Sequence, residues 1–192
     1  MNIEVCFWHE VLENLVPFLF GMGASWMLFL GQHHYKLIKK KRFALDYLKN
    51  SILTQIPKIQ TSLQSAMDAI LNNKGDAYKA LAYEEFSIYP LSSISPSEYY
   101  QIFKQKEFAL FHEIYSMIDF LQNNLPNSII NYYFENVNQH LLDVGMVGDK
   151  EHIKNCSSCH QLKGKGRKAV YAKKQEFQML ENKINELIDL SK

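Results

Sequence analysis

The segment LVPFLFGMGASWMLFLG, from Leu15 to Gly31, contains no charged residue, and the residues from Val11 onward add one glutamate to it. A helix over residues 11–31 would be about 31 Å long, close to the hydrocarbon core of a bilayer at about 30 Å. The core helix of a soluble domain is one alternative. A secretory signal peptide is another, but it begins with basic residues, whereas residues 1–10 contain no Lys or Arg. We therefore predict a transmembrane helix over residues 11–31.

The distribution of charge predicts the orientation of this helix. The chain of 192 residues has 21 Lys and Arg against 20 Asp and Glu, yet residues 1–35 contain none of the basic ones. A basic cluster, Lys36 with Lys39 to Arg42, follows the apolar segment directly. Because basic flanks stay on the cytoplasmic side, we expect a single pass through the cell inner membrane. Residues 1–10 would lie outside, residues 32–42 would form a basic juxtamembrane segment, and residues 43–192 would form a cytoplasmic domain.

Small residues within the apolar segment could bring two copies of the helix together. Gly21, Ala24 and Ser25 share one stripe of a helix with 3.6 residues per turn, and such stripes let transmembrane helices approach closely. Small residues are also common in single spans. Together with the heptad spacing described next, the stripe predicts a homo-oligomer.

The rest of the chain shows helical rather than strand periodicity. Apolar residues from Leu45 to Ile70 recur at heptad spacing, with Lys49 in one of the heptad positions and Pro57 as a point where the helix kinks or restarts. Residues 72–76 read as a turn, residues 77–86 as a short helix and residues 89–93 as a loop. No run of alternating β-branched residues with hairpin turns is present.

Two further helices and their ends can be predicted from capping residues. Ser95, Pro96 and Glu98 form a capping-box pattern, so a long helix is expected from Pro96 to about Asn123. Another helix should end at Gly145, and the last one should run from about Lys168 to Leu190 with Lys173 in a core position. The predicted fold class is therefore all-α: one N-terminal transmembrane helix followed by a cytoplasmic bundle of four to five helices.

The most distinctive motif lies in a strongly basic block, residues 150–174. It contains Cys156-Ser157-Ser158-Cys159-His160, which resembles the haem-attachment motif C-x-x-C-H of c-type cytochromes. The resemblance covers five residues and implies thioether bonds from both cysteines and iron ligation by His160, with Met179 as a conceivable sixth ligand. Haem attachment takes place outside the cytoplasm, so the predicted orientation argues against it.

A zinc site is the second interpretation of the same segment. His152, Cys156, Cys159 and His160 are ligands that Zn²⁺ accepts in tetrahedral geometry. Cys156 and Cys159 lie one helical turn apart, whereas His160 would reach the ion only if the chain left the helix. The third interpretation is that the two cysteines pack without any cofactor, and the absence of a cofactor is the outcome that the sequence favours. Three cysteines are too few for a disulfide scaffold.

A basic stretch follows the cysteines. Lys163, Lys165, Arg167 and Lys168 alternate with glycines, which predicts a flexible loop leading into a helix. Lysine and arginine side chains next to a helix start attract phosphate groups. A nucleotide or another anion could bind there, although the P-loop pattern is absent, and readout of double-stranded DNA is not expected.

No catalytic constellation is present, so we expect a non-enzymatic protein. The preferred hypothesis is that the cytoplasmic domain binds a partner or an anionic ligand and couples this event to an oligomeric span. This layout resembles that of small membrane effectors in antiphage defence, a likeness of organisation and not of motif. The alternatives are a membrane-tethered c-type cytochrome in electron transfer and a plain membrane-anchored scaffold.

Overall fold

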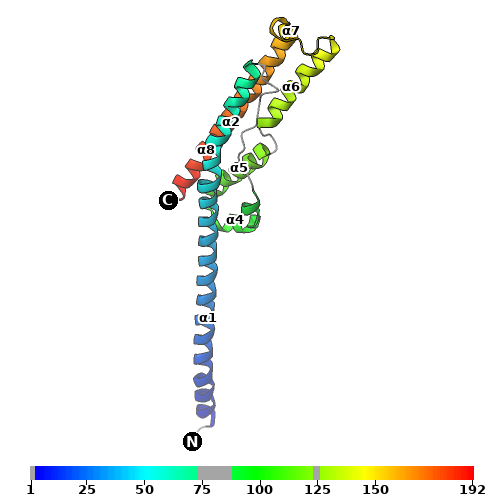
Figure 1. Cartoon of the computed structure of the whole chain (residues 1–192). Helices are drawn as coiled ribbons and strands as arrows, with labels where there is room; N and C mark the ends of the chain where they lie inside the picture. Colours follow the sequence, from blue (N-terminus) through cyan, green and yellow to red (C-terminus); the bar gives the residue numbers. More distant parts are fainter. Residues whose placement is uncertain (1–2, 73–87, 123–125) are drawn as a thin grey trace. The chain divides into compact units, whose positions relative to one another are not determined.

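The structure is a computed structural model that describes residues 3–72, 88–122 and 126–192. Over these residues the chain is helical and has no strand, so the all-α prediction is confirmed (Figure 1). The chain divides into two compact units, Met1–Phe43 and Ala44–Lys192.

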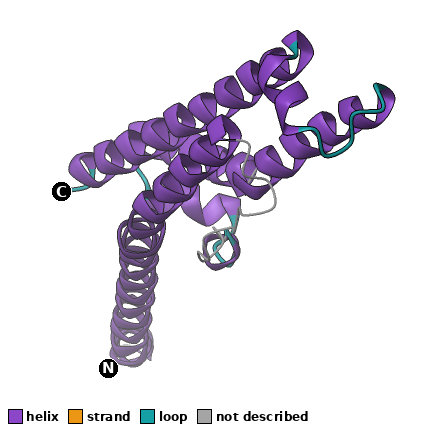
Figure 2. Cartoon of the chain, turned by 45° about the horizontal axis from the view of Figure 1, so that its top comes forward, coloured by secondary structure: helices purple, strands orange, loops and turns teal. Residues whose placement is uncertain are grey.

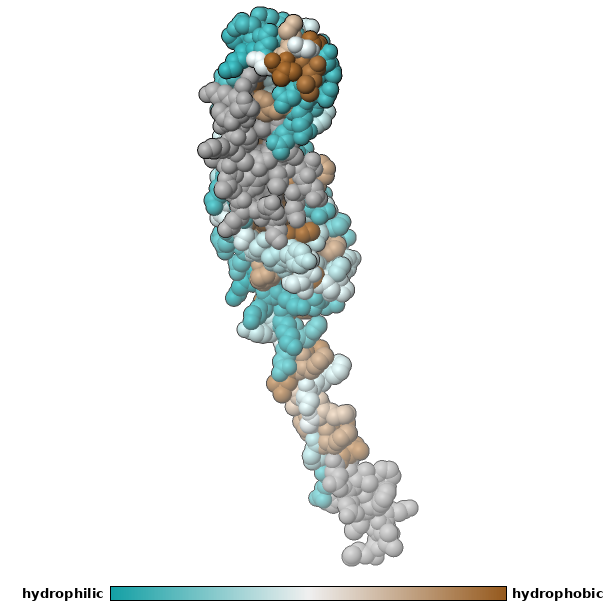
Figure 3. Space-filling model, turned by 45° about the vertical axis from the view of Figure 1, so that its right-hand side comes forward, coloured by the Kyte–Doolittle hydropathy of each residue, from teal (hydrophilic) through white to brown (hydrophobic). Residues whose placement is uncertain are grey.

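The first unit consists of one helix, which belongs to α1 (Ile3–Tyr47). Its apolar side chains from Leu15 to Leu30 are exposed, by 44% at Val16 and up to 76% at Phe20. Brown and pale atoms accordingly follow this helix in Figure 3. Among the described residues this is the one helix that is long and apolar enough to cross a membrane.

A π-helical turn, η1 (Leu48–Ile52), connects α1 to α2 (Leu53–Asn72). At its end the N–H of Leu53 donates to the Leu48 carbonyl, five residues back. A π turn takes up one extra residue and so shifts the buried face. Up to its first residue the buried positions are Ala44 and Leu48, whereas the heptad spacing predicted Leu45 and Lys49. From its last residue onward the prediction is confirmed, because Ile52, Ile56, Ile59, Leu63 and Ile70 are all fully buried.

The second unit is organised around its last helix. Its other elements are α3 (Tyr89–Ser92), α4 (Pro96–Ile102), α5 (Gln105–Gln122), α6 (Pro126–Asp143), α7 (Lys150–Asn155) and α8 (Ser157–Leu190). Helix α8 contacts α2, α5, α6 and α7, and it runs beside α2 in Figures 1 and 2. The predicted seam of α8 is confirmed: Val170, Phe177, Leu180, Ile184 and Leu187 have no exposed surface.

The predicted core lysine of α8 is also buried. Lys173 is 8% exposed, its Nζ lies 2.5 Å from the Glu176 carboxylate, and it stands 4.7 Å from the centre of the Phe120 ring. A buried ammonium group needs such partners, because desolvating an isolated charge is costly.

The predicted long helix from Pro96 is divided in two. The capping box of Ser95 and Glu98 is confirmed, but Phe103 is extended, with φ −106° and ψ 140°, and ends α4. The Glu107 carboxylate then accepts the backbone N–H of Lys104 at 2.9 Å, which caps the start of α5. The Phe103 ring packs beside those of Tyr99 and Phe111, at ring-centre distances of 6.2 and 4.9 Å, and these two rings are themselves 4.4 Å apart. Aromatic packing and a local cap therefore outweigh helix propensity at this point.

Two loop predictions are wrong in the described residues. Residues 89–93, predicted as a loop, include the helical turn α3, and the predicted flexible loop from Lys163 to Lys168 lies inside α8. The reason for the second correction is Gly166. A Cβ built there would lie 3.0 Å from the Tyr133 ring and 3.2 Å from Ile70 Cδ1, so this glycine lets α8 approach α2 and α6 closely. The short helix predicted over residues 77–86 lies outside the described residues.

Candidate metal centre

The turn after α6 brings the following segment back toward the end of that helix. Gly145 has a positive φ of 67°. The N–H of Met146 donates to the Leu141 carbonyl at 2.8 Å, and the N–H of Gly145 donates to the Leu142 carbonyl at 3.1 Å. These two bonds define a Schellman motif, which satisfies the last carbonyls of α6 and reverses the chain. His140 lies in the final turn of α6, directly before this reversal.

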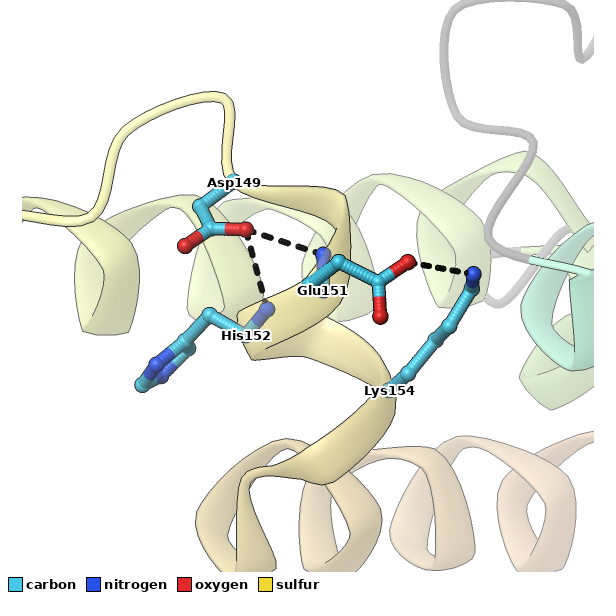
Figure 4. A network of polar contacts seen from close by, with 4 residues as sticks. All are labelled: Asp149, Glu151, His152 and Lys154. Atoms are coloured by element: carbon cyan, nitrogen blue, oxygen red, sulfur yellow. Dashed lines mark hydrogen bonds and ion pairs between the residues drawn. The ribbon is translucent and has the colours of Figure 1, made fainter.

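Asp149 then starts α7 and places the second histidine. Its carboxylate accepts the backbone N–H groups of Glu151 and His152, at 2.9 and 3.0 Å (Figure 4). The Glu151 carboxylate forms an exposed ion pair with Lys154 at 2.7 Å. The aspartate is an N-cap of the usual kind, and it fixes His152 in the first turn of α7.

Both cysteines lie where α7 passes into α8. The N–H of Cys156 donates to the His152 carbonyl at 2.8 Å, and the Cys156 carbonyl accepts the N–H of His160 at 3.1 Å. Cys156 therefore ends α7 and is also the N-cap residue of α8, while Cys159 occupies the first turn of α8. Cys156 is partly exposed and Cys159 is 2% exposed.

These four side chains converge on one point, and we call them the His-Cys cluster: His140, His152, Cys156 and Cys159. Each offers one ligand atom, and the four atoms all lie within 4.8 Å of one another. His140 Nε2 is 3.3 Å from Cys156 Sγ and 3.4 Å from His152 Nε2. Among the described residues this is the one group of three or more His, Cys, Asp and Glu side chains close enough to share an ion.

The surroundings of the two thiols shift their pKa values in opposite directions. The backbone N–H of Cys159 and then the His140 ring stabilise the Cys156 thiolate, which lowers the pKa of Cys156 to about 6. Burial raises the pKa of the Cys159 thiol, and its hydrogen bond with Cys156 raises it further. Amide groups at a helix start favour a thiolate in this way.

Three of the four residues predicted as zinc ligands belong to the cluster, and His160 does not. The His160 ring instead lies 2.8 Å from the Lys154 carbonyl, and His140 takes the fourth place. Sequence reasoning missed His140 because it is far from the cysteines in sequence. The signal that could have found it is the pair of glycines, Gly145 and Gly148, between a helix end and the capping aspartate Asp149.

The four predicted anion-binding residues are not gathered in one place. Lys163 donates to the Leu71 carbonyl near the end of α2, at 3.2 Å. Arg167 and Lys168 line a shallow groove of about 530 Å³, and Lys165 is not among its lining residues. Met67, Gly164, Tyr171, Ala172 and Gln175 complete the groove.

Two of the three small residues predicted for helix packing lie beside a surface hollow of α1. Gly21 and Ser25 line this open hollow of about 860 Å³ together with Phe18, Trp26 and Phe29, whereas Ala24 does not.

No known protein family matches the chain, and neither the curated proteins nor the solved structures contain a significant match to it.

Proposed function

We propose that the chain is a non-enzymatic, single-pass membrane protein whose helical domain binds one zinc ion through the His-Cys cluster. The observation that carries this proposal is the convergence of four ligand atoms, from the end of α6, from α7 and from the start of α8, to within 4.8 Å of one another. Two thiol and two imidazole groups form one of the usual ligand sets of structural zinc sites.

The distances support a tetrahedral ion. With Zn–N bonds of about 2.0–2.1 Å and Zn–S bonds of about 2.3 Å, a tetrahedron has an edge of about 3.3 Å between two nitrogens and about 3.5 Å between nitrogen and sulfur. The nitrogens of His140 and His152 are 3.4 Å apart, and His140 Nε2 is 3.3 Å from Cys156 Sγ. These pairs already have the spacing that a zinc ion would require.

The choice of ligands and their burial favour zinc over the alternatives. Thiolate and imidazole groups select zinc rather than magnesium or calcium, which prefer oxygen. A c-type haem would need His160 as an iron ligand, but His160 contacts the Lys154 carbonyl, and Cys159 is almost fully buried. The ligand types and their positions therefore favour zinc. A covalent haem, the alternative, would be detected by an absorption spectrum.

A site with four protein ligands supports a structural rather than a catalytic role. Catalytic zinc keeps one position open for water or substrate, whereas structural zinc is closed by four side chains. In this chain the ion would tie the last turn of α6 and the short helix α7 to the first turn of α8. Helix α7 has no buried residue of its own, so its position would depend strongly on the ion.

The zinc proposal can be tested on the full-length protein purified in detergent. Native mass spectrometry should show one zinc ion per chain, and the substitutions His140→Ala and Cys159→Ser should each remove it. His160→Ala is the matched control, because this neighbouring histidine lies outside the cluster, and it should retain zinc in full. Retention of zinc by His140→Ala, or a haem spectrum in the wild type, would overturn the proposal.

A second candidate function is the binding of an anionic ligand, and the groove beside α8 favours it. Arg167 and Lys168 supply positive charge there, while Tyr171, 60% exposed, and Gln175 offer an aromatic face and an amide. This combination suits a nucleotide, whose phosphates and base need both kinds of contact. It would link the domain to the signalling role of the antiphage effectors that its layout resembles.

The nucleotide proposal can be tested by titrating the purified protein with a mixture of cyclic and linear nucleotides. Calorimetry then measures the affinity for each nucleotide that binds. Arg167→Ala should weaken binding about tenfold, in line with the loss of one charged hydrogen bond. Lys154→Ala, which removes the same charge from a residue that does not line the groove, should leave the affinity unchanged. Equal nucleotide affinities in the two variants would show that the groove is not the binding site. A protein that binds neither zinc nor nucleotide would fit the plain membrane-anchored scaffold.

We propose an orientation of the membrane span in which residues 1–10 lie outside the cell inner membrane and the helical domain lies in the cytoplasm. The basis is the basic cluster after Tyr35, because basic flanks stay on the cytoplasmic side.

We also propose that two or more spans associate over the hollow beside Gly21 and Ser25. Gly21→Leu should then reduce the oligomeric state in mild detergent, as measured by light scattering. The matched substitution Gly31→Leu, outside the hollow, should leave it unchanged.

A further inference from the structure

The two cysteines of the His-Cys cluster are placed for the formation of a disulfide bond with each other. Residues i and i+3 at a helix start have Cα atoms about 5 Å apart, within the range of roughly 4.4–6.8 Å that disulfides require. Their sulfur atoms are among the four ligand atoms that lie within 4.8 Å of one another. A bond between them would therefore need only small side-chain movements.

Their exposures differ in a way that defines an order of reaction. Cys156 is partly exposed at the junction of α7 and α8, whereas Cys159 is 2% exposed. A disulfide arriving from solution reaches Cys156 first. Cys159 is shielded from that reagent but stands next to Cys156, so it is the thiol that can attack a mixed disulfide formed there.

The net charge of the segment that carries the pair favours an anionic reagent, because residues 149–168 contain six Lys and Arg against two acids, Asp149 and Glu151. Helix α8 contains no acidic residue before Glu176, and its early turns contain Lys163, Lys165, Arg167 and Lys168. Several basic side chains near one end of a domain raise the local concentration of small anions.

We propose that Cys156 and Cys159 undergo thiol–disulfide exchange with an anionic low-molecular-weight disulfide of the glutathione type, and that this exchange releases the zinc ion. The release rests on the zinc site proposed above. The Cys156 thiolate attacks one sulfur of the reagent, forms a mixed disulfide and expels one glutathione thiolate. The Cys159 thiolate then attacks Cys156 Sγ, forms the protein disulfide and expels the second glutathione thiolate.

The exchange is balanced and reversible. Two electrons pass from the two protein thiolates to the reagent, whose disulfide becomes two thiolates. The ion then keeps only the two imidazole ligands of His140 and His152, which hold zinc far more weakly than four ligands do. Excess reduced glutathione reverses both steps and restores the binding site.

The test uses the full-length, zinc-loaded protein with Cys6→Ser, so that the third cysteine does not react. Glutathione disulfide should release one equivalent of zinc, measured with a chromogenic chelator. In parallel, the tryptic peptide of residues 155–163, which contains both cysteines, should lose two hydrogen atoms. Zinc release without this mass change, or no change with the reagent in large excess, would overturn the proposal.

Single-cysteine variants separate the two steps. Cys159→Ser should accumulate a stable glutathione adduct on Cys156, whereas Cys156→Ser should react at least about tenfold more slowly because Cys159 is buried. Equal reaction rates for the two variants would contradict the assigned order. Circular dichroism establishes that both variants are folded, and the peptide analysis of the wild type provides a test that needs neither variant.

Two further measurements distinguish this inference from the zinc proposal and identify the reagent. If the protein forms the disulfide but never binds zinc, the exchange proposal stands and the zinc proposal fails. If the protein binds zinc but resists oxidation, the zinc proposal stands and the exchange proposal fails. At low salt, glutathione disulfide should react about tenfold faster than the cationic disulfide cystamine, and high salt should reduce the difference. Faster reaction with cystamine would overturn the anionic class of reagent.

Discussion

Cys156 and Cys159 have different chemical properties although only two serines separate them. Cys156 stands at the junction of two helices, where the amide of Cys159 and the His140 ring both stabilise its thiolate. Cys159 lies in the first turn of α8 and is buried. The pKa values of two cysteine thiols are thus shifted in opposite directions by hydrogen bonding at one site and by burial at the other.

This difference predicts how the metal-free protein reacts with iodoacetamide. A thiol whose pKa is lowered from 9.0 to about 6 becomes a thiolate at lower pH than usual. The alkylation rate of Cys156 should therefore be nearly constant above about pH 7 and fall about tenfold per pH unit well below pH 6. Mass spectrometry of the peptide of residues 155–163 measures this rate.

Cys159 provides the internal control for the same experiment. Burial raises the pKa of its thiol, so its alkylation should be slow throughout and should increase only at alkaline pH. A rate for Cys156 that still rises between pH 8 and 9, as for an ordinary thiol, would contradict the arrangement around its sulfur.

The two glycines early in α8 predict opposite effects of the same substitution. Gly166→Ala places a methyl group 3.0 Å from the Tyr133 ring, and overpacking of this kind should lower the free energy of unfolding by about 1 kcal/mol. Gly164→Ala meets no atom within 4 Å and should raise it by about 0.5–1 kcal/mol through helix propensity. Thermal unfolding by circular dichroism compares the two, and stabilisation by both would show that Gly166 is not a close contact.

At the scale of elements, local sequence signals predicted helix ends well and helix phase less well. The capping box at Ser95 was predictable because its bonds involve residues three apart. The π-turn η1 was not, since only the packing of Ala44 and Leu48 reveals which face is buried. Likewise, glycines among lysines suggested a loop, but Gly166 is required by a contact with α2 and α6 that no local pattern encodes.

The candidate metal centre shows the same division between local and long-range information. Cys156, Cys159 and His152 share a short segment, so their spacing pointed to a site. His140 belongs to another helix and meets them only because the Schellman turn at Gly145 and the cap at Asp149 fold the chain back. The sequence therefore predicts the region of the site, while its complete ligand set follows from the tertiary structure.

The N-cap of α7, Asp149, should influence the proposed zinc binding although it is not one of the four candidate ligands. Asp149→Ala removes the acceptor for the N–H groups of Glu151 and His152. The loss of such a cap costs about 1 kcal/mol, so the zinc affinity should fall about fivefold in a chelator competition. Glu151→Ala is the control, because its ion pair with Lys154 is exposed and contributes little. Equal affinities in the two variants would show that α7 needs no cap to hold His152.

At the scale of the whole molecule, the candidate membrane helix and the proposed zinc site should be separable. The His-Cys cluster lies entirely within the unit Ala44–Lys192, and the exposed apolar residues of α1 lie in the other. The full-length chain should stay in the membrane fraction after alkaline carbonate extraction. A chain that begins at Lys36 should be recovered in the soluble fraction and bind the same amount of zinc, because it retains every ligand.

The charges that flank the apolar segment predict the direction in which the chain inserts into the membrane. Because the basic cluster follows the apolar segment, a C-terminal fusion to green fluorescent protein should fluoresce, and a C-terminal fusion to alkaline phosphatase should be inactive. Replacing Lys36, Lys39, Lys40, Lys41 and Arg42 with glutamine should weaken this preference, whereas replacing five exposed lysines of the helical domain should not. An active phosphatase fusion to the unaltered chain would place the domain outside. The His-Cys cluster would then meet an oxidising environment, in which exchange at Cys156 would keep the pair as a disulfide.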